Sequence, residues 1–80
     1  MKIIDRRSHL PLYAQLKEIL LEGVNAGVYP PGSSLPPEMM LANQFGLSRA
    51  TVRQAFKDLE YEGYISRVQG RGTIVIREKS

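Results

Sequence analysis

The sequence predicts an α+β domain in which three helices are followed by a two-stranded β-hairpin. Apolar residues recur at helical spacing in residues 11–25, and two shorter helical patterns, at 37–44 and 49–62, are separated by one tight turn. The segment 64–76 first alternates and then becomes β-branched around a glycine-containing turn, which is typical of a hairpin. Because 80 residues allow one small domain with a single core, we place that domain at 1–76.

The first helix is expected to run from Pro11 to Asn25. Proline fits the first turn of a helix, where its missing N–H leaves no hydrogen bond unmade. The apolar residues that follow share one face of this helix, namely Leu12, Leu16, Ile19, Leu20 and Val24. Gly27 marks the C-terminal end, the rigid turn 30–32 prevents continuation, and residues 34–35 are expected to form a short extended segment.

The second helix is expected at 37–44, where a proline and the early acid Glu38 favour a helix start. Its apolar stripe is predicted to contain Met39, Leu41, Ala42 and Phe45. Gly46 should end this helix, Leu47 should fill the core, and the Ser48 hydroxyl should cap the next helix by accepting from backbone N–H groups. The segment therefore forms a helix, a tight turn and a second helix.

The third helix is expected to end near Glu62, because Gly63 can act as its C-terminal stop. Its inward stripe follows the positions i, i+3, i+4 and i+7, which are Val52, Ala55, Phe56 and Leu59. The opposite, outward face carries Ala50, Arg53, Gln54 and Lys57.

The composition favours an anionic partner and argues against catalysis. A net charge of +3 and a pI near 9.5 suit nucleic acid, and also suit an ordinary basic surface. There is no cysteine, and His9 is the only histidine, so disulfides, thiolate metal sites and Cys–His pairs are excluded. Three carboxylates near the end of the third helix have the pattern of solvated charges, namely Asp58, Glu60 and Glu62. We therefore expect no enzyme, no cofactor and no metal.

The sequence predicts a cytoplasmic protein without a membrane partner. No stretch approaches the roughly 20 apolar residues that a membrane span needs. The start of the chain turns polar after Ile4, which is too early for a signal peptide.

The turn 45–48 between two helices matches the helix-turn-helix plan, in which the second helix presents its N-terminal residues to the major groove of DNA. Arg49 and Arg53 lie one turn apart there, and a guanidinium can donate two hydrogen bonds to guanine or grip a phosphate. Ala50 can contact a thymine methyl, Thr51 can donate to a phosphate, and Gln54 can pair with an adenine. The alternative for all these side chains is a solvated helix face.

The hairpin is predicted from strands at 64–68 and 73–76, joined by the turn 69–72. Its tip, Gly70-Arg71-Gly72, combines backbone freedom with one positive charge, and further basic residues flank it, namely Arg67 and Arg77. Such a tip can enter a minor groove, where narrow A·T-rich segments attract arginine, although an ordinary flexible hairpin has the same appearance. The whole pattern predicts a winged helix-turn-helix with its recognition helix at 49–62 and its wing at 69–72.

Several motifs of the chain occur in the order and spacing of one bacterial family. They are Pro11-Leu12-Tyr13, Leu35-Pro36, Glu38, Ser48-Arg49-Ala50-Thr51-Val52-Arg53, Glu62-Gly63 and Gly70-Arg71-Gly72-Thr73. Over about positions 10–76 the chain resembles the GntR family of transcriptional regulators. The resemblance implies that Arg49 and Arg53 contact bases and phosphates, that Thr51 contacts phosphate and that Gly70 lies at the wing. The complete candidate DNA-binding set is Glu38, Ser48, Arg49, Ala50, Thr51, Arg53, Gln54, Lys57, Gly70, Arg71, Gly72 and Thr73.

Two positions depart from the family pattern. Pro37 stands where serine or alanine is common, and it cannot donate a backbone hydrogen bond to phosphate. Met39 stands where the family often has a basic residue.

The resemblance also implies partners for a longer protein. Family members bind palindromic double-stranded operators as homodimers, and they continue into a C-terminal domain that binds a small-molecule effector. Residues 77–80 are then the start of the linker to that domain. The start at 11–15 is most similar to the HutC-type branch, and the alternatives for the C-terminal part are a short helical tail or an aminotransferase-like domain. Repression is the commoner outcome in the family.

A winged-helix protein-interaction module without operator reading is the alternative function. Such a module should expose apolar anchors on its third helix, where this chain has charged and amide side chains and Tyr61 is the single candidate anchor. An RNA reader needs exposed aromatic rings, whereas Phe45 and Phe56 are both expected in the core.

Overall fold

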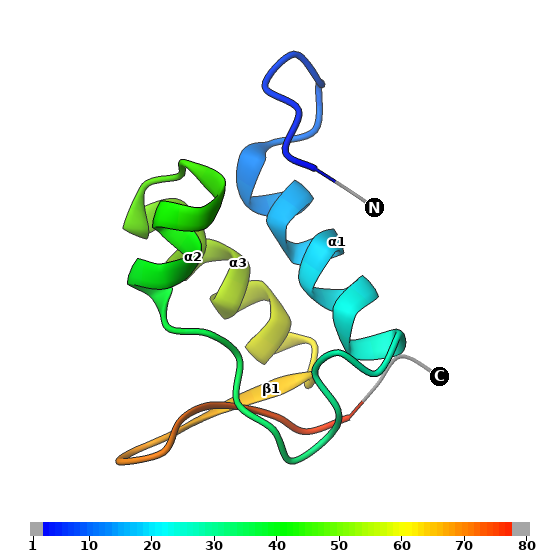
Figure 1. Cartoon of the computed structure of the whole chain (residues 1–80), viewed down its shortest axis with the longest axis vertical. Coiled ribbons are helices and arrows are strands. Elements are labelled where there is room, and N and C mark those ends of the chain that lie inside the picture. Colours follow the sequence, from blue (N-terminus) through cyan, green and yellow to red (C-terminus); the bar gives the residue numbers. More distant parts are fainter. Residues whose placement is uncertain (1–2, 78–80) are drawn as a thin grey trace.

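The computed structural model describes residues 3–77 and shows three helices followed by an antiparallel hairpin (Figure 1). The elements are α1 (Leu12–Asn25), α2 (Glu38–Phe45), α3 (Arg49–Tyr61), β1 (Ile65–Val68) and β2 (Gly72–Val75). The predicted fold class is therefore confirmed. The differences are at the ends of elements. Three residues predicted as helical are caps, namely Pro11, Pro37 and Glu62, and α2 includes Phe45. In the hairpin, Tyr64 and Ile76 lie outside the strands and Gly72 is already part of β2.

The core lies between α1 and α3 and is closed by α2 on one side and by the hairpin on another (Figure 1). All four predicted inward residues of α3 are buried, and Phe56 at 1% exposure is the largest side chain among the fully buried ones. Leu12 and Phe45 are half-buried and pack at the edge of this core, while Ile19 is half-buried. Burial of these apolar surfaces supplies most of the stabilisation that so small a domain has.

The predicted place of Met39 in the apolar stripe of α2 is wrong. Its side chain is 57% exposed, whereas Leu41 and Ala42 are buried. Two residues along an α-helix turn the side-chain direction by about 200°, so Met39 and Leu41 cannot face the same core. This helix of 8 residues buries one face, with Leu41 and Ala42, so Met39 on the other face is left exposed.

The extended segment at 33–35 pairs with the hairpin. The Leu35 N–H donates to the Thr73 carbonyl at 2.9 Å, and the Val75 N–H donates to the Ser33 carbonyl at 2.8 Å. This segment lies on the free side of β2, since β1 pairs with the other side in the register Ile65↔Val75. The sequence predicted the extended conformation, and the structure adds that it holds the hairpin against the helices.

Two side chains, Lys17 and Arg77, attach neighbouring segments to the C-terminal end of α3. The Lys17 ammonium of α1 donates to the Glu62 carboxylate, and this hydrogen bond raises the pKa of Lys17. The Arg77 guanidinium stacks 4.4 Å from the centre of the Tyr64 ring and donates to the Glu62 carbonyl at 2.8 Å. The rest of the predicted linker, 78–80, lies outside the described residues. Within 3–77, no helix is long and apolar enough to cross a bilayer.

Candidate nucleic-acid interface

The turn between α2 and α3 has the geometry that its residues require. Gly46 adopts a left-handed conformation with φ of +67°, which the lack of a Cβ makes inexpensive. The Ser48 hydroxyl accepts from the Thr51 N–H at 3.1 Å, so the predicted cap of α3 is present. The hydroxyls of Ser48 and Thr51 also lie 2.8 Å apart, within hydrogen-bond distance. The first turn of α3 is therefore capped, with Arg49 and Ala50 exposed and Thr51 half-buried.

The outward face of α3 is polar along its length. The four side chains predicted there are all exposed, namely Ala50, Arg53, Gln54 and Lys57. The Gln54 amide donates to the Asp58 carboxylate at 2.9 Å, so it must leave that partner to pair with a base. Tyr61, at the end of the helix, is 93% exposed. The outward residues one and two turns before it are Lys57 and Gln54, which are polar.

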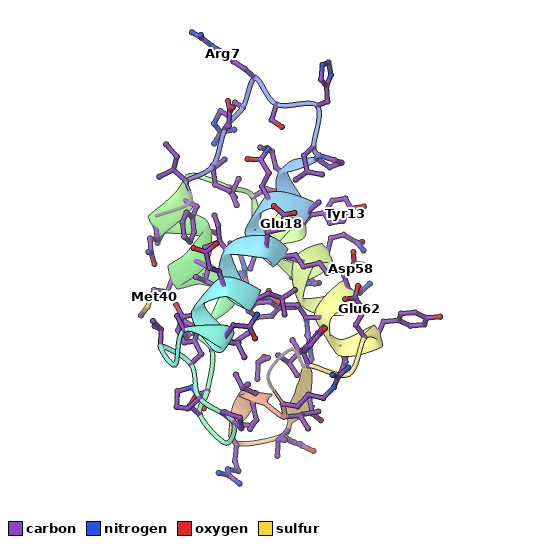
Figure 2. The ribbon with its side chains drawn as sticks, turned by 90° about the vertical axis from the view of Figure 1, so that its right-hand side faces the viewer. Arg7, Tyr13, Glu18, Met40, Asp58 and Glu62 are labelled. Atoms are coloured by element: carbon purple, nitrogen blue, oxygen red, sulfur yellow. The ribbon has the colours of Figure 1, made fainter. Side chains whose placement is uncertain are left out.

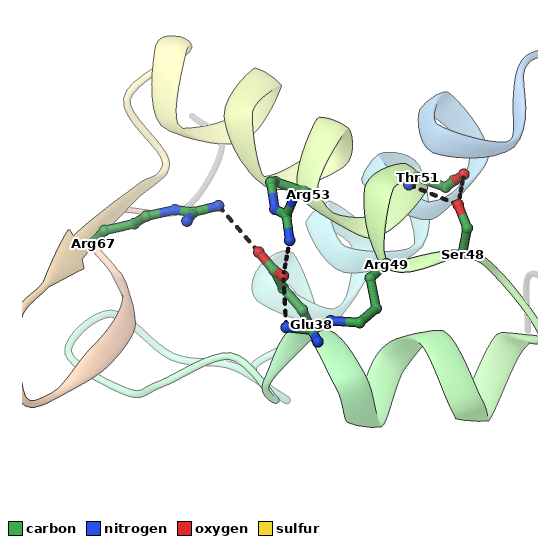
Figure 3. A network of polar contacts seen from close by, with 6 residues as sticks. All are labelled: Glu38, Ser48, Arg49, Thr51, Arg53 and Arg67. Carbon is green, nitrogen blue, oxygen red and sulfur yellow. Dashed lines mark hydrogen bonds and ion pairs between the residues drawn. The ribbon is translucent and has the colours of Figure 1, made fainter.

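Three arginines converge on one carboxylate at the start of α2 (Figure 3). Glu38 Oε1 lies 3.3 Å from the Arg53 guanidinium and 3.9 Å from that of Arg49, and Oε2 lies 3.4 Å from that of Arg67. The Glu38 side chain is only 16% exposed, whereas the three guanidinium side chains are 43–59% exposed. We call these four residues the arginine cluster. It presents three cations on one surface and holds them with a single anion.

Arg67 connects the hairpin to this cluster. Its guanidinium carbon lies 5.9 Å from the centre of the Phe56 ring, so the side chain extends over the edge of the core before it reaches Glu38. The sequence showed Arg67 only as a basic residue that flanks the wing, and it was not placed in the candidate set. Its distance of 29 positions from Glu38 leaves no local pattern that could have indicated the pairing.

The wing is a short, exposed turn. Pairing of Val68 with Gly72 leaves three residues in the loop, and the Arg71 N–H donates to the Val68 carbonyl at 2.9 Å. Gly70 occupies the third position of this turn with φ of +82°, a conformation that favours glycine. Arg71 is exposed at the tip, while Thr73 is half-buried opposite Arg67. The hairpin extends away from the helices at one end of the molecule (Figure 1).

Acidic side chains gather on a different side of the molecule. Figure 2 shows Glu18, Asp58 and Glu62 on the side formed by α1 and the C-terminal half of α3. Asp58 follows Arg53 by five residues and so points about 140° away from it around the helix. Asp58 and Glu62 therefore face away from Arg53, and a polyanion is attracted to the surface that carries the arginine cluster.

The described residues offer little to a metal ion. Within 3–77, no group of three His, Asp or Glu side chains is placed to hold one. The interface provides hydrogen-bond donors, namely guanidinium, ammonium, hydroxyl and amide groups. Phosphate oxygens and the acceptor atoms of base edges accept hydrogen bonds from such groups.

The sequence and the structure both match known regulators. Residues 12–75 match the family described as bacterial regulatory proteins, gntR family. The chain is 49% identical over 70 residues to the arabinose metabolism transcriptional repressor of Geobacillus stearothermophilus, covering 88% of this chain and 19% of that protein. It is 38% identical over 69 residues to the histidine utilization repressor of Pseudomonas putida, covering 86% of this chain and 28% of that protein.

A solved structure agrees with this match. The crystal structure of AraR(DBD) in complex with operator ORX1 has a TM-score of 0.81 and 42% identity, and the alignment covers 89% of this chain and 88% of that one. The chain spans less than a third of the length of the two repressors. It belongs to the gntR family of bacterial regulatory proteins and forms a winged helix-turn-helix domain of that family.

Proposed function

We propose that this domain binds double-stranded operator DNA sequence-specifically and serves a bacterial transcriptional regulator. One observation carries the proposal: Arg49 and Arg53 are exposed at the capped start of α3 and are held beside Arg67 of the hairpin by one carboxylate. The similarity to a domain solved on its operator supports the same conclusion. In this arrangement α3 enters the major groove and the wing reaches the adjacent minor groove.

The candidate residues then divide by the DNA group that they contact. Arg49 and Arg53 donate to guanine edges, because their guanidinium groups are exposed on the first two turns of α3. Four other residues of α3 support these contacts. Ala50 approaches a thymine methyl and Gln54 pairs with an adenine. Thr51 and Lys57 each contact a phosphate. Ser48 acts through the cap that orders the first turn.

The wing supplies the remaining contacts. Arg71 inserts into the minor groove, and Gly70 and Gly72 allow the backbone of the tip to approach the sugar-phosphate walls. Thr73 acts indirectly, because its carbonyl accepts from Leu35 and so fixes the base of the wing.

Glu38 acts on the arginines instead of on the DNA backbone. A carboxylate repels phosphate, and this one is mostly covered by the guanidinium groups around it. By limiting the freedom of Arg53 and Arg67 before DNA arrives, it lowers the conformational entropy that these long side chains lose on binding. Glu38 also links Arg53 of α3 to Arg67 of the hairpin, so the distance between the recognition helix and the wing stays constant.

The remaining roles concern a longer, cytoplasmic protein. The two repressors are three or more times longer than the matched region. We propose that the chain is followed by a C-terminal domain that dimerises and binds a small-molecule effector, so that a homodimer represses a promoter with a palindromic operator. Two recognition helices about 34–36 Å apart would then read half-sites one helical turn from each other.

The test is a selection from a randomised duplex pool, with the domain and its Arg49→Ala/Arg53→Ala variant side by side at two salt concentrations. We expect the domain to enrich one short motif and the variant to lose this enrichment while it stays folded. Equal recovery of all sequences by both proteins would contradict operator reading and would favour the protein-interaction module, with Tyr61 as its anchor.

Glu38→Gln is expected to lower the ratio of operator affinity to random-duplex affinity about tenfold, which corresponds to about 1.4 kcal/mol. The amide keeps the shape of the side chain but removes the charge that holds three guanidinium groups, so the arginines reach phosphates on any sequence. Fluorescence anisotropy on the selected and a scrambled duplex measures this ratio. Glu60→Gln is the matched control, because it removes the same charge from an exposed position at the far end of α3. Equal ratios in the two variants would show that Glu38 does not position the arginines.

A further inference from the structure

We propose that residues 5–10, which we call the N-terminal arm, form a second DNA-backbone site that grips phosphates on the side of the major groove opposite the wing. The site uses Arg6 and Arg7, which no part of the interface described above includes. The inference rests on the proposed function and extends the DNA footprint of the domain beyond α3 and the wing.

The arm is a fixed loop attached to α1 by one buried amide. Gln15 is 7% exposed, and its Oε1 accepts from the Asp5 N–H at 2.7 Å. Its Nε2 donates to the carbonyls of Asp5 and Leu10, each at 2.8 Å. Both ends of the arm are therefore held by the same side chain, and a buried amide that is hydrogen-bonded at both its oxygen and its nitrogen is costly to move.

Hydrogen bonds within the arm shape the loop between these two ends. The Asp5 carboxylate accepts from the Arg7 N–H at 2.9 Å, and the Ser8 hydroxyl accepts from the Leu10 N–H at 3.1 Å. The single acid of the arm is thus directed at the backbone. Asp5 remains an exposed anion, so the arm carries two guanidinium cations and one carboxylate, and Arg7 projects from the end of the molecule (Figure 2).

Arg6 places the arm beside the recognition helix. Its guanidinium donates to the carbonyl of Gly46, in the turn that leads into α3 and two residues before the Ser48 cap. A guanidinium carries five N–H donors, so this contact leaves others for a phosphate. It also covers a carbonyl oxygen that would otherwise repel a phosphate at that place. The start of α3 therefore has an arginine on each side of its cap, Arg6 and Arg49.

The arm and the wing lie at opposite ends of the long axis of the molecule, with α3 between them (Figure 1). That axis measures 34 Å, close to one helical turn of B-DNA, whereas the major groove is only about 12 Å wide. With α3 in the groove, the wing covers the backbone on one side and the arm reaches the backbone on the other. Arginine suits this position because its planar donors match two phosphate oxygens.

The experiment compares Arg6→Gln/Arg7→Gln with Arg77→Gln, which removes an arginine that is stacked on Tyr64. Anisotropy titrations between 50 and 200 mM salt are run on the selected operator and on a scrambled duplex. Each lost phosphate contact makes the slope of log affinity against log salt shallower by about 0.9. We expect a change of about 1 to 2 units for the arm variant on both duplexes, and no change for Arg77→Gln.

Phosphate ethylation interference on the operator locates the contact. We expect the arm variant to lose interference on the side of the half-site away from the wing and to enrich the same motif as the unmodified domain. If the slope and the interference pattern stay the same while Arg49→Ala/Arg53→Ala abolishes enrichment, the arm is no DNA site and the proposed function stands. If the unmodified domain binds neither duplex, both proposals fall.

Discussion

Phe56→Ala is expected to remove most of the stability of the domain. The ring is 1% exposed at the centre of α3, and truncation leaves a cavity between α1, α3 and the hairpin. Large-to-small changes of this kind cost about 3 to 5 kcal/mol. A small domain has a free energy of unfolding of about 5 kcal/mol or little more, so this loss leaves a large unfolded population. Arg67 also loses the ring that supports it, so the arginine cluster should lose order as well.

Urea unfolding followed by circular dichroism measures this effect. Tyr61→Ala is a matched control, because it truncates an aromatic residue of the same helix that is 93% exposed. Its unfolding free energy should change by no more than about 0.5 kcal/mol. Equal midpoints for Phe56→Ala and Tyr61→Ala would contradict the central place of Phe56 in the core.

Arg53→Ala is expected to weaken binding to the selected operator by about 5- to 150-fold, which corresponds to about 1 to 3 kcal/mol. The guanidinium lies at the exposed start of α3, and its only protein partner among the described contacts is Glu38 at 3.3 Å. Exposed ion pairs of this kind contribute about 0 to 1 kcal/mol to stability, so the melting temperature should change little. Arg49→Ala should behave similarly.

Arg53→Lys separates base reading from charge. Lysine keeps the positive charge but cannot make the two parallel hydrogen bonds of a guanidinium. We therefore expect Arg53→Lys to retain most affinity for a scrambled duplex and to lose most of the preference for the operator, whereas Arg53→Ala loses both. Anisotropy titrations on the two duplexes at fixed salt give the comparison. A folded Arg53→Lys variant that keeps full operator preference would show that Arg53 does not read bases. A variant that unfolds would contradict the exposed, outward placement of Arg53.

The sequence by itself determined the order and type of the elements, because the signals for them are local. The stripe of Val52, Phe56 and Leu59 repeats within two turns of α3, and burial of these residues confirms it. Gly46 and Ser48 act on groups within five positions of themselves, so the turn and the cap could also be predicted. Met39 was misplaced because apolar character alone does not say which way a side chain of a short helix points.

Only the tertiary structure decided which charges meet. Two of the three arginine partners of Glu38 are 15 and 29 positions away, at Arg53 and Arg67, and Arg6 reaches across 40 positions to Gly46. Such pairs depend on how α1, α2, α3 and the hairpin pack, and the packing is set by the buried apolar faces instead of by the charged residues themselves. The sequence could therefore predict a basic recognition helix and a wing suited to DNA, while the convergence of three arginines on Glu38 and the contact of Arg6 with Gly46 came from the fold.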